Sequence, residues 1–117
     1  MTVDDSILPK DLAVNFAKTL VARDFKHASL MTCTPNLGET TPKALKRSFD
    51  RMIPANFGHV DPIQAVEVLD EWPDKEADDI LWIYVHLGGR LYAEAITVVV
   101  SRKPEGLRIR CIEWGRP

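Results

Sequence analysis

The sequence has few of the residues that mark secreted, redox-active or metal-binding proteins. It contains only two cysteines, Cys33 and Cys111, and their spacing matches neither a metal-binding pair nor a redox dithiol motif. His27 and His86 have no partner at the spacing of metal ligands. We therefore expect reduced thiols, a cytoplasmic location, no metal site and no cofactor.

The sequence also lacks a long apolar run and an excess of basic residues. Its apolar runs are much shorter than the roughly 20 residues that span a membrane. The first residues, MTVDDSILPKD, do not show the basic-then-apolar pattern of a secretion signal. The net charge of −2 argues against nucleic acid as the main partner. We expect neither a membrane nor a nucleic-acid partner.

What the sequence does contain is typical of one small globular domain. Its 117 residues suit a single domain. Hydrophobic residues make up 45% and charged residues 27%, which is the ordinary balance for a chain that folds around a core. We find no internal repeat. The expected domain covers residues 1–117, with a short tail at 1–8 and a core at about 9–114.

The stretch from Ile80 to Trp114 predicts three long antiparallel strands, because β-branched and aromatic residues dominate it. Gly88-Gly89 predicts a two-residue hairpin turn, which would place Ile83 opposite Glu94. Lys103 to Gly106 predicts a four-residue turn, which would place Ile96 opposite Glu113.

Strand alternation then assigns side chains to two faces of the sheet. One face carries Leu81, Ile83, Val85, Tyr92, Glu94, Ile96, Val98, Val100, Ile109, Cys111 and Glu113. The other face carries the aromatic patch of Trp82, Tyr84, Ile112 and Trp114. Neither face is plainly polar, so we expect this chain's helices on the first face and a second copy of the chain on the other.

The N-terminal half predicts helices, from the spacing of its apolar residues and its capping signals. The expected elements are helices at 9–22, 25–31 and 42–53, a first strand at 63–70, and an acidic linker, EWPDKEAD, before Ile80. Val66 and Val68 would point inward and Glu67 outward. The predicted fold class is α+β, with N-terminal helices packed on a curved four-stranded antiparallel sheet.

At this level the chain resembles the NTF2-like superfamily, also called the cystatin-like α+β cone. Three segments carry the likeness: the leading helix that breaks at a turn, LAVNFAKTLVARDFKHASLM; the helix after a Thr-Pro start, TPKALKRSF; and the C-terminal meander ending in LRIRCIEW. The resemblance spans roughly 9–114. It implies a cone-shaped fold that serves isomerases, dehydratases, cyclases, binding subunits and bacterial toxin-immunity proteins alike, so it does not decide the function.

The predicted pocket lies inside this cone. Its expected ligand-binding residues are Phe16, Leu20, Phe49, His59, Tyr92, Glu94, Ile96 and Glu113. Glu94 and Glu113 are the candidate catalytic pair, because diagonal neighbours lie about 7–8 Å apart and two carboxylates in an apolar pocket would raise one pKa. Against this, both could reach solvent or pair with Arg90 or Arg116.

Three functions follow from these patterns. The leading hypothesis is a non-catalytic NTF2-like module that binds a small, mostly apolar ligand or a protein partner. The second is a proton-transfer isomerase, dehydratase or cyclase with a glutamate base; the absence of a tyrosine from the first helix weighs against it. The third is a protein-interaction factor such as a bacterial toxin-immunity protein, with a filled cone and a binding surface at Asp70 to Asp79. The predicted dimer interface is Trp82, Tyr84, Ile112 and Trp114.

Overall fold

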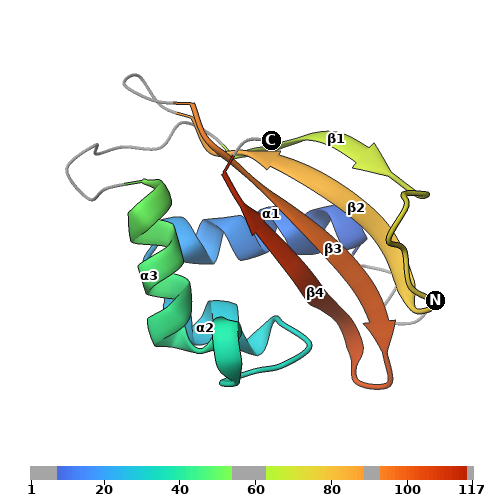
Figure 1. Cartoon of the computed structure of the whole chain (residues 1–117), viewed down its shortest axis with the longest axis horizontal. Helices are drawn as coiled ribbons and strands as arrows, with labels where there is room; N and C mark the ends of the chain where they lie inside the picture. Colours follow the sequence, from blue (N-terminus) through green and yellow to red (C-terminus); the bar gives the residue numbers. More distant parts are fainter. Residues whose placement is uncertain (1–7, 54–62, 89–92, 116–117) are drawn as a thin grey trace.

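The computed structural model describes residues 8–53, 63–88 and 93–115, and these form helices followed by an antiparallel sheet (Figure 1). The elements are α1 (Pro9–Val21), α2 (Phe25–Leu30), the 3-10 helix η2 (Gly38–Thr40), α3 (Pro42–Met52), β1 (Gln64–Leu69), β2 (Asp79–His86), β3 (Ala95–Lys103) and β4 (Gly106–Trp114). The predicted α+β fold class is confirmed.

The three α-helices begin where the capping residues predict. Proline occupies the first turn of α1 and of α3, where its missing N–H costs nothing. The Asp24 side chain accepts a hydrogen bond from the His27 N–H at 3.2 Å and so caps α2. Thr41 Oγ1 accepts from the Ala44 N–H at 3.1 Å and caps α3.

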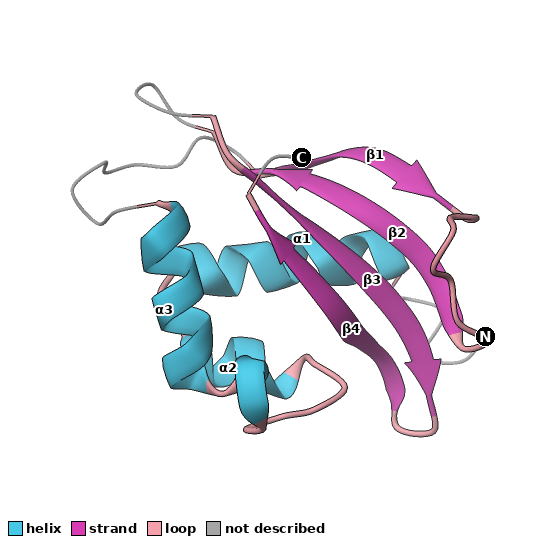
Figure 2. Ribbon diagram, viewed as in Figure 1, coloured by secondary structure: helices cyan, strands magenta, loops and turns pink. Residues whose placement is uncertain are grey.

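The helices lie on one face of the sheet and the sheet curves around α1 (Figure 2). The predicted apolar stripe of α1 is buried, and it consists of Leu12, Ala13, Phe16, Ala17 and Leu20. It meets the fully buried strand residues Ile83, Val85, Ile96, Val98 and Val100. This contact forms the core, and it confirms the inward face predicted for β2 and β3.

The four strands follow one another in space in the order β1-β2-β3-β4, so β1 and β4 are the edges. The edge of β4 is covered over part of its length by the chain after α2. The Ile109 N–H donates to the Met31 carbonyl and the Cys33 N–H donates to the Ile109 carbonyl, both at 2.8 Å. Thr32 thereby forms an isolated parallel bridge with Ile109.

The register predicted between β2 and β3 is wrong by four residues. Ile83 pairs with Val98, not with Glu94, and His86 pairs with Ala95. The Leu87 N–H still donates to the Glu94 carbonyl at 2.8 Å, so the connection is longer than a turn at Gly88-Gly89. From Leu81 to His86 this even shift leaves each described side chain on the face that alternation assigned to it. The register shifts once more between Asp79 and Leu81, and Asp79 pairs with Ser101 on the outer face.

The register predicted between β3 and β4 is correct near the turn and wrong beyond it. Val100 pairs with Ile109 as predicted, but Val99 pairs with Cys111, so Arg110 is the extra residue of a β-bulge. Ile96 therefore pairs with Trp114, not with Glu113. The bulge shifts the pairing by one residue and exchanges the two faces for the last part of β4.

The first strand also differs from its prediction. Val66 is the extra residue of another bulge, between Ala65 and Glu67, and it is exposed, not inward. Val68 pairs with Ile83 on the helix side of the sheet, yet 40% of its surface is exposed because it lies on the outermost strand. Glu67 is exposed as expected.

Candidate functional site

The interior where the sequence predicts a pocket is filled with side chains. Phe16, Leu20 and Ile96 have no exposed surface, and Phe49 retains only 4%. A residue with no exposed surface borders no space that a water molecule could enter. These four predicted ligand-binding residues are therefore core residues in this structure. His59 and Tyr92, the other two candidates that are not glutamates, lie outside the described residues.

The structure does not bring the two candidate catalytic glutamates together. Glu113 pairs with Thr97 and is exposed on the sheet face away from the helices. Glu94 lies just before β3 and, by alternation, on the same side as the buried Ile96. The bulge at Arg110 causes this separation, because without it Glu113 would lie on the helix side.

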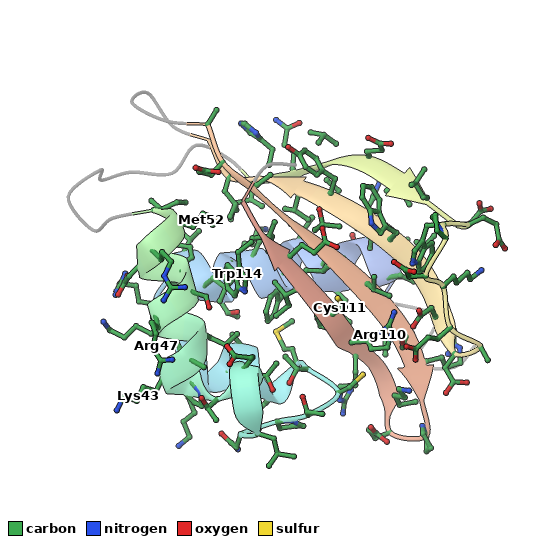
Figure 3. All side chains as sticks on the ribbon, viewed as in Figure 1. Lys43, Arg47, Met52, Arg110, Cys111 and Trp114 are labelled. Carbon is green, nitrogen blue, oxygen red and sulfur yellow. The ribbon has the colours of Figure 1, made fainter. Side chains whose placement is uncertain are left out.

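The bulge also divides the four aromatic and aliphatic residues of the predicted dimer interface. Ile112 and Trp114 are partly buried and pack against the core. Figure 3 shows Trp114 on the side of β4 that faces α3. Trp82 and Tyr84 pair with Val99 and Thr97 and stay on the outer face. The predicted aromatic patch on this face is therefore reduced to two residues.

The residues that the structure does bring together lie at one end of this outer face, around Asp79. The Asp79 side chain is completely buried. Its carboxylate accepts hydrogen bonds from Arg110 Nε at 2.7 Å and Arg110 Nη2 at 2.8 Å. It also accepts from Ser101 Oγ and from the Glu76 N–H, the latter at 2.8 Å. We call these four residues the Asp79 clasp.

In the structure the acidic linker comprises residues 70–78, between β1 and β2, and the Asp79 clasp fixes its C-terminal end against the sheet. Glu76 adds an ion pair to Arg110 at 3.1 Å. The Asp78 carbonyl accepts from the Arg102 N–H at 2.9 Å, and its side chain lies 3.4 Å from Lys103 Nζ. These contacts hold the end of the linker nearest β2, at Glu76 and Asp78, against the sheet.

The electrostatics of the clasp favour an ionised carboxylate. Burial acts most strongly on the pKa of Asp79 and raises it, because the charged form loses hydration. Hydrogen bonds from Arg110, Ser101 and the Glu76 N–H together outweigh burial, so the pKa of Asp79 lies below its ordinary value. The hydrogen bond to Asp79 in turn raises the pKa of Arg110. The pair is charged throughout the physiological range.

The two thiols lie close to the same guanidinium but are not activated by it. Burial raises the pKa of both Cys33 and Cys111, and it outweighs the lowering by Arg110. Figure 3 places Cys111 directly beside Arg110 on β4. A raised pKa keeps a thiol protonated and a poor nucleophile at neutral pH. Neither cysteine has the character of a catalytic residue.

Charge is distributed unequally over the surface of the molecule. Exposed carboxylates gather on β1 and the acidic linker that follows it, namely Glu67, Asp70, Glu71, Asp74, Glu76 and Asp78. The helix layer carries exposed basic residues on α3. Figure 3 shows Lys43 and Arg47 projecting from the side of α3 that faces away from the sheet. We call β1 and the acidic linker together the acidic side of the molecule.

Sequence reasoning located the acidic linker but not the clasp. Asp79 and Arg110 are 31 residues apart, and no local motif connects them. The one available signal was an aspartate at the start of a strand otherwise rich in apolar residues. Alternation alone would place Asp79 on the helix side with Leu81. The register shift between Asp79 and Leu81, which the sequence does not reveal, places it on the outer face.

Several kinds of site are absent from the described part of the chain. It contains no group of three or more His, Cys, Asp and Glu side chains that could hold a metal ion. None of its helices combines the length and apolar character needed to cross a membrane.

Comparison of the chain with known protein families, with characterised proteins and with solved structures finds no match.

Proposed function

We propose that this protein is a non-catalytic module that binds a protein partner through its acidic side. The observation that carries the proposal is the filled interior around Phe16, Leu20 and Ile96. A small apolar ligand is normally enclosed in a cavity of roughly 300–1,000 Å³. Among the described residues the predicted lining offers no such space, so binding at the surface is favoured over binding in the cone.

The enzyme hypothesis has less support. Its base was one of two glutamates that share a pocket, and Glu94 and Glu113 lie on different sides of the sheet. Glu113 is exposed, and a solvated carboxylate lacks the apolar surroundings that tune a general base. The protein-binding form of the leading hypothesis is therefore preferred to a proton-transfer reaction.

The acidic linker is the proposed partner surface. The end of the linker nearest β2 is tied to the sheet through Glu76 and Asp78, and Lys75 links the Asp70 carbonyl to the Glu71 carboxylate within the linker. A partner would therefore have less of the loop to order on binding. Complementary charge would speed association and select a basic partner. The NTF2-like resemblance of the sequence suggests a bacterial toxin-immunity protein as the specific form of this function.

Two further expectations belong to the same proposal. Cys33 and Cys111 are both free thiols, which fits a cytoplasmic protein. A second copy of the chain would cover the outer face around Trp82 and Tyr84, where no helix of the described chain packs. Sedimentation velocity of the wild type and of Trp82→Ala checks this homodimer: a wild-type monomer at tens of micromolar would exclude it.

The test of the function is affinity capture with charge-reversed protein. Asp70→Lys with Asp74→Lys reverses two exposed carboxylates and leaves the Asp79 clasp intact. The matched control, Asp11→Lys with Glu39→Lys, makes the same change in net charge on the helix side. We expect a basic protein to be captured by the wild type and the control but not by the linker variant. Equal capture by all three would exclude the acidic linker as the binding surface.

A further inference from the structure

The two edges of the sheet are treated differently. The edge of β4 is occupied by the chain around Thr32, which exchanges backbone hydrogen bonds with Ile109. The opposite edge is β1, and within the described residues β2 is the only strand that pairs with it. Figure 1 shows β1 on the side of the sheet away from α2 and α3. Its outward N–H and C=O groups form an open template for another strand.

The side chains of β1 do not protect this edge. Val66 and Val68 are 55% and 40% exposed, although they are large apolar residues. Natural edge strands are usually guarded by lysine, proline or an inward-pointing charge. The strand, QAVEVL, contains no lysine or proline, and its single charge is Glu67 on the outer face. Its one guard is the bulge at Val66, which interrupts regular pairing on the N-terminal side.

The charge around β1 argues against a second copy of this chain as the occupant. Antiparallel pairing about a two-fold axis at Glu67 would place Glu67 opposite its own copy, and like charges directly opposite destabilise a ladder. Asp70 and Glu71 are exposed immediately after the strand and add to this repulsion. A strand from a basic protein would be attracted, because its lysine or arginine side chains would lie beside Glu67, Asp70 and Glu71.

We propose that an extended segment of a partner protein, with alternating apolar and basic residues, adds as a fifth strand to the open edge of β1. Cross-strand neighbours share a face, so the residue beside Val68 lies on the helix side and should be apolar. The residue beside Glu67 lies on the outer face and should be lysine or arginine. The alternation of the partner segment follows directly from the opposite orientation of these two side chains.

This inference rests on the proposed function and gives it a binding mode. Backbone hydrogen bonds to β1 would supply affinity, and the neighbouring side chains would supply selectivity. The acidic linker continues from Leu69, so the same partner would meet the exposed carboxylates of Asp70 and Glu71 directly after the strand. The bulge at Val66 limits regular pairing to the C-terminal part of β1, which favours a short segment over a long strand.

The test uses a synthetic peptide with the sequence Lys-Val-Lys-Val-Lys-Val and a matched peptide with glutamate in place of lysine. Binding is measured by fluorescence anisotropy, and amide exchange of residues 64–69 is followed by NMR. Alternate N–H groups of β1 point away from β2 and exchange freely in the isolated protein. We expect the lysine peptide to protect those alternate amides, and the glutamate peptide to bind at least tenfold more weakly.

Two variants separate the edge from the acidic linker. Val68→Lys places a lysine at an exposed position of the edge strand. It should weaken binding of the lysine peptide about tenfold while the fold is retained. Asp70→Lys with Asp74→Lys tests the linker alone. If the peptide binds but Val68→Lys has no effect and the β1 amides stay unprotected, the strand-addition mode is wrong although the acidic surface stands. If the lysine peptide binds the linker variant as tightly as the wild type and still protects the β1 amides, the acidic linker is not part of the binding surface, although strand addition stands.

Two remaining outcomes also decide the question. Protection of the same amides without peptide, rising with protein concentration alongside a dimer in sedimentation velocity, would overturn the partner chemistry in favour of a second copy. Equal binding of the lysine and glutamate peptides would overturn the charge argument. Alternating protection by the lysine peptide, reduced by Val68→Lys, would support the proposal as stated.

Discussion

Asp79 is the residue on which the arrangement of the acidic side depends. Its carboxylate is buried and receives hydrogen bonds from two side chains and one backbone N–H. A buried charge is tolerated when its partners are in place and becomes costly when one is removed. The contribution of the pair is therefore seen most clearly by deleting the arginine, which leaves the carboxylate behind.

Arg110→Ala should lower the free energy of unfolding by about 3–5 kcal/mol, because Asp79 would remain buried without its counter-charge. Urea denaturation followed by circular dichroism measures this loss. Lys103→Ala is the control, since its ion pair with Asp78 is long and Asp78 is exposed. It should change the stability by no more than about 1 kcal/mol. Similar losses in both variants would mean that the Asp79 clasp contributes no more to the free energy of unfolding than an exposed ion pair.

The pH dependence of stability should carry the signature of the same carboxylate. The pKa of Asp79 in the folded protein lies below that of an unfolded aspartate, which is about 3.9. Folding therefore favours the ionised form, and its stabilisation is present above that unfolded value. It is lost as the pH falls through the folded pKa. Asp50, whose pKa is lowered chiefly by its hydrogen bond with Lys46, adds a contribution of the same sign.

Comparison of Asp79→Asn with the wild type should isolate the contribution of Asp79. Chemical denaturation between pH 2 and pH 7 is expected to show a shallower loss of stability on acidification in the variant. Asp50→Asn serves as the matched control, because it removes another lowered carboxyl pKa, at a partly exposed site. An identical acid profile for Asp79→Asn and the wild type would contradict the assigned role.

At the scale of elements, the bulge in β4 decides which side chains belong to the core. Downstream of Arg110 it directs Ile112 and Trp114 toward the helices and Glu113 outward. One added residue thus selects between an apolar and a charged set of inward side chains. The rest of β4 follows the ordinary alternation.

Deletion of Arg110 should cost about as much stability as removal of its side chain. Arg110 is the extra residue of the bulge, so the shortened strand can pair regularly with β3 and keep Ile112 and Trp114 on the helix side and Glu113 on the outer face. We expect a dispersed NMR spectrum and a loss of about 3–5 kcal/mol in the free energy of unfolding, because Asp79 would again be buried without its counter-charge. Loss of the cooperative unfolding transition in the deletion variant would show that the bulge itself is required for folding.

The sequence predicts the elements well and the bulges poorly, for a physical reason. Alternation and caps are local, so α1, α3 and the inward faces of β2 and β3 follow from neighbouring residues. The error in the predicted turn near Gly88 did not change the faces assigned to the β2 and β3 side chains from Leu81 onward, because a shift of four residues preserves alternation. The bulge at Arg110 shifts pairing by one and is stabilised by contacts with Asp79, which is distant in the chain. Because of this bulge, Glu94 and Glu113 lie on different sides of the sheet and the predicted pair does not form.

At the scale of the whole molecule, the filled interior decides which partners are possible. Phe16 lies at its centre and contacts the sheet without any exposed surface. If the interior is closed by packing and not by a bound molecule, removal of the Phe16 ring should create a cavity that the wild type lacks. The same variant then reports on both stability and ligand access.

Phe16→Ala should destabilise the fold by about 3–5 kcal/mol through lost burial and the cavity left behind. Added benzene should restore part of this loss, because dry apolar cavities of this kind bind it. Thermal denaturation with and without benzene measures both effects. Leu30→Ala, at an exposed position, should show neither. A wild type that is itself stabilised by benzene would mean that a cavity is already present.

The separation of Asp79 from Arg110 along the chain has a consequence for the order in which the protein folds. The clasp joins the first residue of β2 to β4, and its hydrogen bonds cannot form until both hairpins are in place. Closing contacts of this range is entropically expensive early in folding, so the clasp should be absent from the transition state. Arg110→Ala is then expected to accelerate unfolding while leaving the refolding rate nearly unchanged, as stopped-flow kinetics can measure. The clasp would act as a latch that sets the lifetime of the acidic surface once folded, and a slowed refolding rate would place it in the nucleus instead.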